Sequence, residues 1–234
     1  MCDSQLTGGR TERRQVLRAL GARTVLVGLG TTASAGQEGP PAELISGDGI
    51  HPVFGFSALE ADVEAPVGVD HTVEALIRPR EGGEIPEFYF EPTGLAIEPG
   101  DTVRFDLTTP HRSVTAYHPA PGMTQRVPDG VPPFSSPVLA GGAYWLYTFE
   151  EEGVYDFHCG PHEAFGHVGR IVAGSATGPG ATPVADVEPG ELRGPIFTAA
   201  TVLDDPALDP DCVLDRGRVS WDEIAPESKL PQLS

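Results

Sequence analysis

Residues 153–173 read GVYDFHCGPHEAFGHVGRIVA and contain two short runs rich in β-branched, apolar and aromatic residues. The runs are 153–158 and 168–173, and both have the length and composition of β-strands. Gly160 and Pro161 follow the first run closely, and this pair is typical of a tight turn. The segment therefore predicts a strand, a compact loop and a second strand.

The loop between these two strands holds three side chains that bind soft metal ions. Cys159 follows the end of the first strand, His162 comes three residues later, and His167 comes five residues after that. A tight turn after a strand end lets Cys159 and His162 point at one atom. A thiolate with two imidazoles is the donor set that copper selects when the geometry is close to trigonal. The spacing therefore predicts a mononuclear copper site.

Upstream of this loop the sequence predicts several more short strands. Residues 102–107 alternate with a period of two, so that Val103, Phe105 and Leu107 share one face. The other strand candidates are 73–77, 88–90, 94–101 with its Pro-Gly-Asp turn, 113–118 and 143–149. Short strands at this spacing predict an all-β fold, namely an antiparallel β-sandwich with Greek-key connections.

Residues 85–173 resemble the cupredoxins, the blue copper proteins of the plastocyanin, pseudoazurin and halocyanin type. The resemblance rests on IEPGDTVRF at 97–105, YTF at 147–149 and GVYDFHCGPH at 153–162. The flanking stretches SVTAYHP and GVPPFSSP resemble a haloarchaeal branch of that family. The resemblance implies a cupredoxin-like Greek-key sandwich that holds one copper ion cycling between Cu(I) and Cu(II). It also implies a one-electron carrier and not an enzyme.

The ligand loop departs from the family pattern at its last position. The family usually has a methionine there, a long and weak axial ligand, whereas this chain has His167. Because an imidazole is a stronger donor than a thioether, the substitution predicts a shorter fourth bond, a more tetragonal site and a lower reduction potential. The alternative is that His167 faces solvent, which would leave three strong ligands and a weak backbone oxygen.

The second departure lies upstream, where the family has its first histidine two residues before a valine. Arg112 stands at that place before Val114, and it cannot bind copper. His111 is one residue earlier and, with a small bulge, would turn inward. We therefore select His111, Cys159 and the two loop histidines as the metal ligands. Two alternatives stay open, namely His118 in place of His111, or no third strong ligand besides Cys159 and His162.

Two further residues near the loop need an assignment. His158 alternates away from Cys159 along the strand, so we interpret it as a structural or surface residue. Cys212 could pair with Cys159 in an exported protein, but that disulfide would abolish the copper site. We therefore expect Cys212 to be a lone thiol.

The composition excludes some classes of partner. The chain has 234 residues with 15 Lys and Arg against 34 Asp and Glu, which gives a net charge of −19. Nucleic acid is not an expected partner, because phosphate binding needs a basic surface. Lys229 is the only lysine. An acidic chain with almost no lysine resembles proteins of salt-loving archaea, so we expect a halophilic protein.

The N-terminus reads as an export signal. Arg13 and Arg14 form a twin-arginine pair before an apolar run, and Ala33-Ser34-Ala35 offers a cleavage site. The expected location is extracellular or at the cell surface, with no membrane span in the mature chain. The expected organisation is a twin-arginine signal at 1–35, a Gly/Pro-rich acidic leader at 36–84, the copper domain at 85–173, a linker at 174–190, and an irregular extension at 191–234, partly helical or mobile.

The functional expectation is an exported electron carrier whose partner is a redox protein at the outer face of the membrane. No small organic substrate is expected, because the sequence has no recognisable catalytic motif or phosphate loop. An apolar patch of Phe134, Pro161 and Phe165 would surround the exposed edge of His162. Two alternatives remain: a redox enzyme with an open copper position for a small ligand, and a non-redox extracellular binding module.

Overall fold

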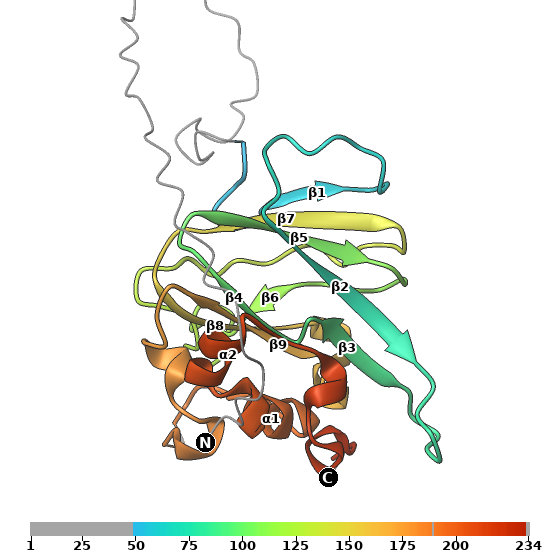
Figure 1. Ribbon diagram of the computed structural model, residues 1–234, viewed down its shortest axis with the longest axis vertical. Coiled ribbons are helices and arrows are strands. Elements are labelled where there is room, and N and C mark those ends of the chain that lie inside the picture. Colours follow the sequence, from blue (N-terminus) through green and yellow to red (C-terminus); the bar gives the residue numbers. More distant parts are fainter. Residues whose placement is uncertain (1–48, 189, 233–234) are drawn as a thin grey trace, which may run out of the picture. The chain divides into compact units, whose positions relative to one another are not determined.

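The computed structural model describes residues 49–188 and 190–232, and the expected export signal lies outside them. Two five-stranded sheets face each other (Figure 1). The strands are β1 (Phe56–Ala58), β2 (His71–Arg78), β3 (Glu87–Glu91), β4 (Gly94–Ile97), β5 (Asp101–Leu107), β6 (Thr115–Ala116), β7 (Ala143–Phe149), β8 (Gly153–His158), β9 (Val168–Ala173) and β10 (Arg218–Val219). The α-helices are α1 (Thr198–Leu203) and α2 (Pro210–Arg216). The 3₁₀ turns are η2 (Gly160–Phe165), η3 (Pro179–Ala181), η4 (Val184–Asp186), η5 (Pro206–Leu208), η6 (Trp221–Glu223) and η7 (Pro226–Lys229).

The expected β-sandwich is confirmed, and the order of its strands is now defined. The first sheet has the order β1-β7-β5-β2-β3, and the second has the order β10-β4-β9-β8-β6. Most neighbours are antiparallel, but β2 pairs with β5 and β4 pairs with β9 in parallel. The parallel pairs arise because the chain crosses from the first sheet to the second within two residues, between β3 and β4, and β5 then returns beside β2.

The two sheets enclose an aromatic core. Val103, Phe105 and Leu107 all point into it and are fully buried, as their alternation predicts. The Phe105 ring meets the Phe157 ring of the opposite sheet edge to face, with centroids 5.4 Å apart. Phe90 contacts Phe157 in the same way, at 5.0 Å. These contacts hold β8 firmly against the first sheet, so the loop that follows β8 starts from a rigid base.

The boundary that we expected at residue 85 is wrong, because the sandwich begins earlier. β1 and β2 are both strands of the first sheet. Tyr144 and Leu146 of β7 pack outward against Ile50 and Ala58, so the segment before β2 covers that face of the sheet. β7 is therefore buried on both faces, which accounts for its nearly continuous apolar sequence, AYWLYTF.

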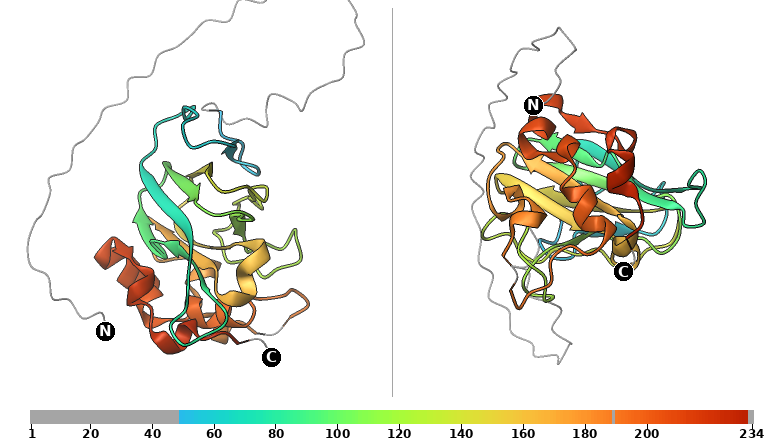
Figure 2. Two further views of the ribbon diagram at one scale, coloured as in Figure 1. Left: turned by 90° about the vertical axis from the view of Figure 1, so that its right-hand side faces the viewer. Right: turned by 90° about the horizontal axis from the view of Figure 1, so that it is seen from below.

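The C-terminal extension packs on the outer face of the second sheet (Figures 1 and 2). Val168 and Val172 of β9 form a second apolar cluster with Ala199, Val202 and Trp221. β10 also adds a strand to the edge of β4. The sequence left open whether this extension is mobile; the structure shows that it completes the fold. Within the part of the chain that the structure describes, every helix is too short or too polar to cross a bilayer.

A buried ion cluster fastens the expected linker to the sandwich. Asp156 of β8 lies between Arg126 and Arg170, at 2.8 Å and 2.7 Å from their Nε atoms, and its side chain is fully buried. Both arginines also donate to the carbonyl oxygen of Gly180, and Arg170 donates to that of Leu208. The expected linker is therefore held against the domain at Gly180, because the carbonyl oxygen of that residue accepts from two buried guanidinium groups.

Candidate metal centre

The three loop residues come from a turn that is closed by backbone hydrogen bonds. η2 connects β8 to β9, and the Cys159 N–H donates to the His167 carbonyl across the base of the loop, at 2.9 Å. The His162 N–H donates to the Cys159 carbonyl, also at 2.9 Å. Gly166 adopts a left-handed conformation with φ of 87°, which reverses the chain just before His167. This geometry folds three distant positions of the loop onto one point.

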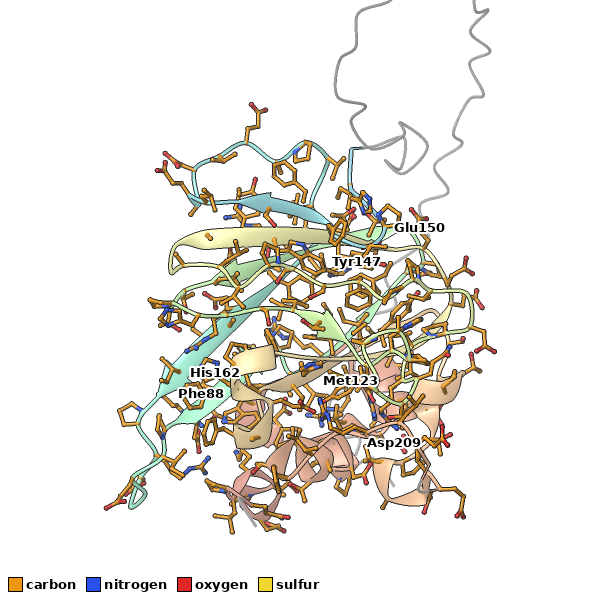
Figure 3. All side chains as sticks on the ribbon, turned by 180° about the vertical axis from the view of Figure 1, so that it is seen from behind. Phe88, Met123, Tyr147, Glu150, His162 and Asp209 are labelled. Carbon is orange, nitrogen blue, oxygen red and sulfur yellow. The ribbon has the colours of Figure 1, made fainter. Side chains whose placement is uncertain are left out.

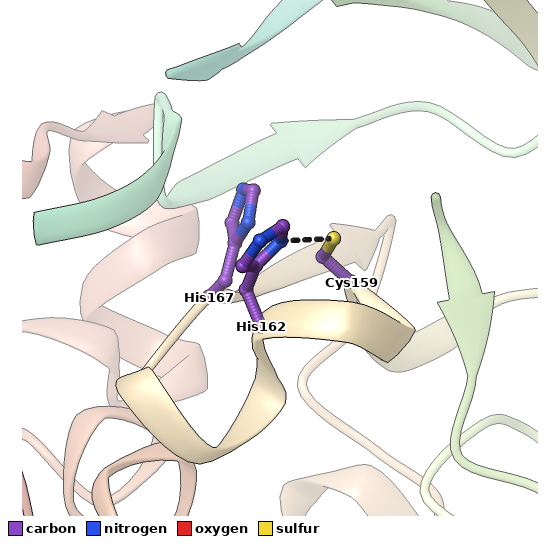
Figure 4. Close-up of side chains that lie close together, drawn as sticks. All are labelled: Cys159, His162 and His167. Carbon is purple, nitrogen blue, oxygen red and sulfur yellow. Dashed lines mark hydrogen bonds between the residues drawn. The ribbon is translucent and has the colours of Figure 1, made fainter. Parts of the chain in front are cut away.

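Cys159, His162 and His167 each offer one ligand atom, and these atoms lie within 4.8 Å of one another (Figure 4). The Cys159 Sγ and the His162 Nδ1 are 3.3 Å apart. Cys159 and His167 are buried, and His162 is half-buried. The structure therefore brings together the three loop residues that the sequence selected. A thiolate and two imidazoles in this arrangement fit a copper ion.

His167 gives the clearest sign that a metal belongs here. Its side chain has no exposed surface, and neither ring nitrogen has a hydrogen-bond partner among the described residues. The ring centroid lies 4.2 Å from that of Phe90. A buried imidazole without partners is costly, and a coordinate bond to a metal would compensate for that cost. The alternative in which His167 faces solvent is wrong.

His162 lies at the rim of the cluster. Phe88 stacks on its ring with centroids 4.3 Å apart and an interplanar angle of 14° (Figure 3). Burial, together with the positive charge of Arg112, lowers the pKa of His162 to about 4. Burial also lowers the pKa of His167 well below its usual range. Both imidazoles are therefore neutral near pH 7 and do not need to lose a proton before they bind a metal.

The Cys159 thiol is buried, and nearby polar and charged groups act on its pKa. Burial raises its pKa, while the Ser113 N–H and the Arg112 charge act in the opposite direction. The Ser113 N–H points at the Sγ, with a nitrogen to sulfur distance of 3.5 Å. The thiol is free, so the Cys159–Cys212 disulfide is absent. Cys212 is not the lone thiol that we expected either.

The upstream ligand that we selected, His111, does not join the cluster. His111 is exposed, and its backbone φ is 62°. Its carbonyl oxygen lies 4.0 Å from the Cys159 Sγ, and its side chain acts on the cluster only electrostatically, by helping to lower the pKa of His162. The alternative, His118, is also outside the cluster, and its Nδ1 accepts a hydrogen bond from the Ala120 N–H at 3.1 Å.

Arg112 takes the place beside the cluster instead. Its Nη1 lies 3.1 Å from the His162 Nδ1 and 3.3 Å from the Nε2. It is a residue of the site that we had set aside because it cannot bind copper. The available signal was its place two residues before Val114, where the family has its first ligand.

Of two other sequence expectations about the surroundings, the one for Phe134 is wrong and the structural interpretation of His158 is confirmed. Phe134 cannot belong to a surface patch around His162, because it is fully buried among Trp145, Tyr147 and Phe149. His158 is a buried structural residue, and its ring packs 4.5 Å from that of Tyr117.

The C-terminal extension also reaches the ligand loop, which the sequence did not reveal. Glu163 follows His162 and is nearly buried. Its carboxylate accepts hydrogen bonds from Tyr117 Oη at 2.9 Å and from Arg193 Nη1 and Nη2 at 2.8 Å and 2.9 Å. On the other side of the loop, a side chain at Gly166 would collide with Thr198 of α1. The extension therefore fixes the loop from two directions.

We expect Arg193→Gln to reduce copper affinity by about tenfold, the lower end of what loss of an outer partner costs a metal site. The substitution leaves the buried carboxylate of Glu163 without its cation, so the loop that carries His162 loosens. Competition with a copper chelator measures the change. Arg218→Gln is the matched control, because it removes a charge from a more exposed pair. Equal affinities of the two variants would contradict the expectation.

Comparison with known proteins agrees with this site. Residues 80–174 match the copper binding proteins of the plastocyanin/azurin family. A putative pseudoazurin from Rhizobium leguminosarum bv. viciae is 33% identical over 122 residues, which are 52% of this chain and 72% of that protein. A pseudoazurin from Paracoccus pantotrophus is 34% identical over 94 residues, 40% of this chain and 59% of that one.

Solved structures of lower similarity are also found. The crystal structure of pseudoazurin from Methylobacterium extorquens AM1 is 23% identical, with a TM-score of 0.39 over 63% of this chain and 96% of that chain. The relationship itself rests on the sequence matches and on the Cys and His ligand loop between β8 and β9. The chain therefore belongs to the plastocyanin/azurin family of copper binding proteins.

Proposed function

We propose that the protein is a one-electron carrier whose copper ion is held by Cys159, His162 and His167. The observation that carries this proposal is the buried group of one thiol and two neutral imidazoles, in which His167 has no other partner. Membership of a copper protein family that typically carries electrons supports it. Copper, when bound, supplies a one-electron couple between Cu(I) and Cu(II).

The residues around the ligands suit this role because they limit rearrangement and exclude water. Cys159 follows the end of β8 and His167 precedes the start of β9, and a direct backbone hydrogen bond joins the two residues. Phe88 and Phe90 cover the two imidazoles. Protein ligands that keep their positions at both metal charges add little to the reorganisation that accompanies the arrival of an electron.

The exposed edge of the site is the proposed route for electrons. His162 is half-buried, and exposed Pro161 and half-buried Phe165 lie beside it in η2. Of the three residues that we expected in an apolar patch around His162, only Pro161 and Phe165 contribute to its surface. We propose a redox protein at the outer face of the membrane as the partner that docks there.

Copper reconstitution followed by voltammetry tests the function. We expect one copper ion per chain, a visible thiolate-to-copper band and a reversible one-electron wave. Stoichiometric copper without a visible band, or with no reversible wave at any salt concentration, would refute the proposal. The same titration with zinc gives the colourless reference that a non-redox binding module would resemble.

His167→Met is expected to raise the reduction potential and move the absorption toward that of a blue site. The imidazole is a stronger donor than a thioether and stabilises the cupric state, so its replacement by methionine favours Cu(I). Voltammetry and electron paramagnetic resonance of the copper-loaded variant measure both effects. His118→Met is the control, because that residue lies outside the cluster. If the His167→Ala variant had the same spectrum as the wild type, His167 would not be a ligand.

We also propose export by the twin-arginine route and a place in a haloarchaeal branch of the family. Arg13, Arg14 and the small residues at 33–35 support export, and the net charge of −19 with a single lysine supports adaptation to salt. Mass spectrometry of protein from the medium and the cell surface tests the export. Only the unprocessed chain inside the cell would count against it.

A further inference from the structure

Arg112 is a buried cation that lacks the partner such a group normally has. The residue is only 3% exposed, and in the described part of the chain no carboxylate forms an ion pair with it. Its Nη1 donates to the Pro110 carbonyl oxygen at 3.1 Å, but its Nε is buried without any hydrogen-bond partner. A buried charge is normally paired, so Arg112 requires an explanation.

Among the residues that the structure describes, Cys159 supplies the opposite charge that acts on Arg112, through its thiolate form. The guanidinium also lies over the Phe88 ring, 5.2 Å from its centroid, but a ring carries no net charge. The compensation by Cys159 is lost when a metal binds, because the thiolate then serves as a ligand. With a cupric ion, one thiolate and two neutral imidazoles beside the guanidinium, the buried group carries two net positive charges. Water is largely excluded there, so an excess of this size is costly.

The cluster also has room in its ligand set. It supplies three protein donors, and the His111 imidazole is outside the group. From the upstream segment Arg112 approaches the ligand atoms, with its Nη1 3.1 Å from the His162 Nδ1, and its guanidinium donates hydrogen bonds but accepts none. Because Arg112 stands where the upstream ligand was expected, a copper ion held by Cys159, His162 and His167 would have one position open to an external ligand.

We propose that Arg112 forms a binding site for one small monovalent anion, such as chloride or azide, next to the oxidised metal. The unpartnered Nε and the guanidinium charge would hold the anion on one side, and the open metal position would hold it on the other. This inference rests on the copper site proposed above. It adds a ligand that neither the family membership nor the three protein ligands specify.

Charge balance makes the anion dependent on the redox state. One electron from the protein partner lowers the charge of the metal by one, and one anion then leaves to the solvent. The buried group carries a single net positive charge before and after the transfer. Electron uptake is therefore coupled to anion release, and the anion stabilises the oxidised form only.

The experiment is a chloride titration of the copper-loaded full chain at constant ionic strength, with a weakly coordinating salt as the balance. We expect the reduction potential to fall by about 59 mV for each tenfold rise in chloride once the oxidised site is saturated. Azide should produce a new charge-transfer band in the oxidised protein. A reversible wave and a visible spectrum that both ignore chloride and azide would overturn the inference while leaving the electron carrier intact.

Three variants assign the anion to Arg112. Arg112→Gln removes the charge and should weaken azide binding at least tenfold, whereas Arg112→Lys keeps the charge and should retain binding. Arg112→His supplies a further imidazole donor at the open position and should abolish the response. Arg218→Gln, an exposed position with the same loss of charge, should behave as the wild type. Undiminished azide binding in Arg112→Gln would refute the role of the guanidinium. If a variant fails to fold, the titrations of the wild type with chloride and azide still test the anion site.

Discussion

Copper-loaded Cys159→Ser is expected to lose the intense visible band completely and to bind copper at least about 100-fold more weakly than the wild type. This loss exceeds the 10- to 100-fold that removal of an outer partner costs a metal site, because Cys159 is a direct ligand. The serine hydroxyl is a poor donor near neutral pH, since it does not ionise as a thiol does when a metal binds. It is also a hard oxygen donor where the site needs a soft one.

Absorption spectra and a competitive copper titration measure both parts of this result. The fold should survive, because serine is close to cysteine in size and can keep the polar contacts of the Cys159 side chain, namely those with His162 Nδ1 at 3.3 Å, the Ser113 N–H at 3.5 Å and the His111 carbonyl at 4.0 Å. His118→Asn is the control, because it changes a histidine outside the cluster. A coloured copper form of Cys159→Ser would contradict the assigned ligand set.

Asp156→Asn is expected to lower the free energy of unfolding by about 3–5 kcal/mol. The substitution keeps the size of the side chain but removes the only carboxylate between Arg126 and Arg170, whose side chains are 0% and 4% exposed. Two buried guanidinium groups are then left without a counter-charge. The loss is a large fraction of the total stability of a typical domain, about 5–15 kcal/mol.

Urea unfolding of the metal-free protein at one fixed salt concentration measures this loss. Asp106→Asn is the matched control, because Asp106 pairs with Arg104 where both side chains are 22–30% exposed. A pair so close to solvent contributes at most about 1 kcal/mol. Equal destabilisation by the two substitutions would show that the buried cluster does not hold the linker and the C-terminal extension to the sandwich.

The residue pattern was enough to predict most of the strands and the ligand loop, although it did not predict β1 or β10. Residues 102–107 alternate in hydrophobicity, and one residue of a strand in two must face the core, so this pattern specifies the strand and its buried face without further information. Cys159, His162 and His167 lie within nine residues. Over so short a span the local turn alone brings the side chains together, and the structure places them as the spacing predicts.

The surroundings of that loop, in contrast, depend on local backbone geometry and long-range packing that the residue pattern does not reveal. Whether the side chain of His111 or that of Arg112 faces the cluster depends on one local backbone conformation, the φ of 62° at His111. The two residues are neighbours, and the sequence pattern does not show which of their side chains points inward. Apart from the predicted strand at 73–77, residues 49–84 and 191–232 have too little periodicity to show where they pack. Their places follow from long-range contacts, such as Tyr144 with Ile50 and Arg193 with Glu163. Such contacts join segments that are far apart in the chain, and no local pattern encodes a partner at that distance.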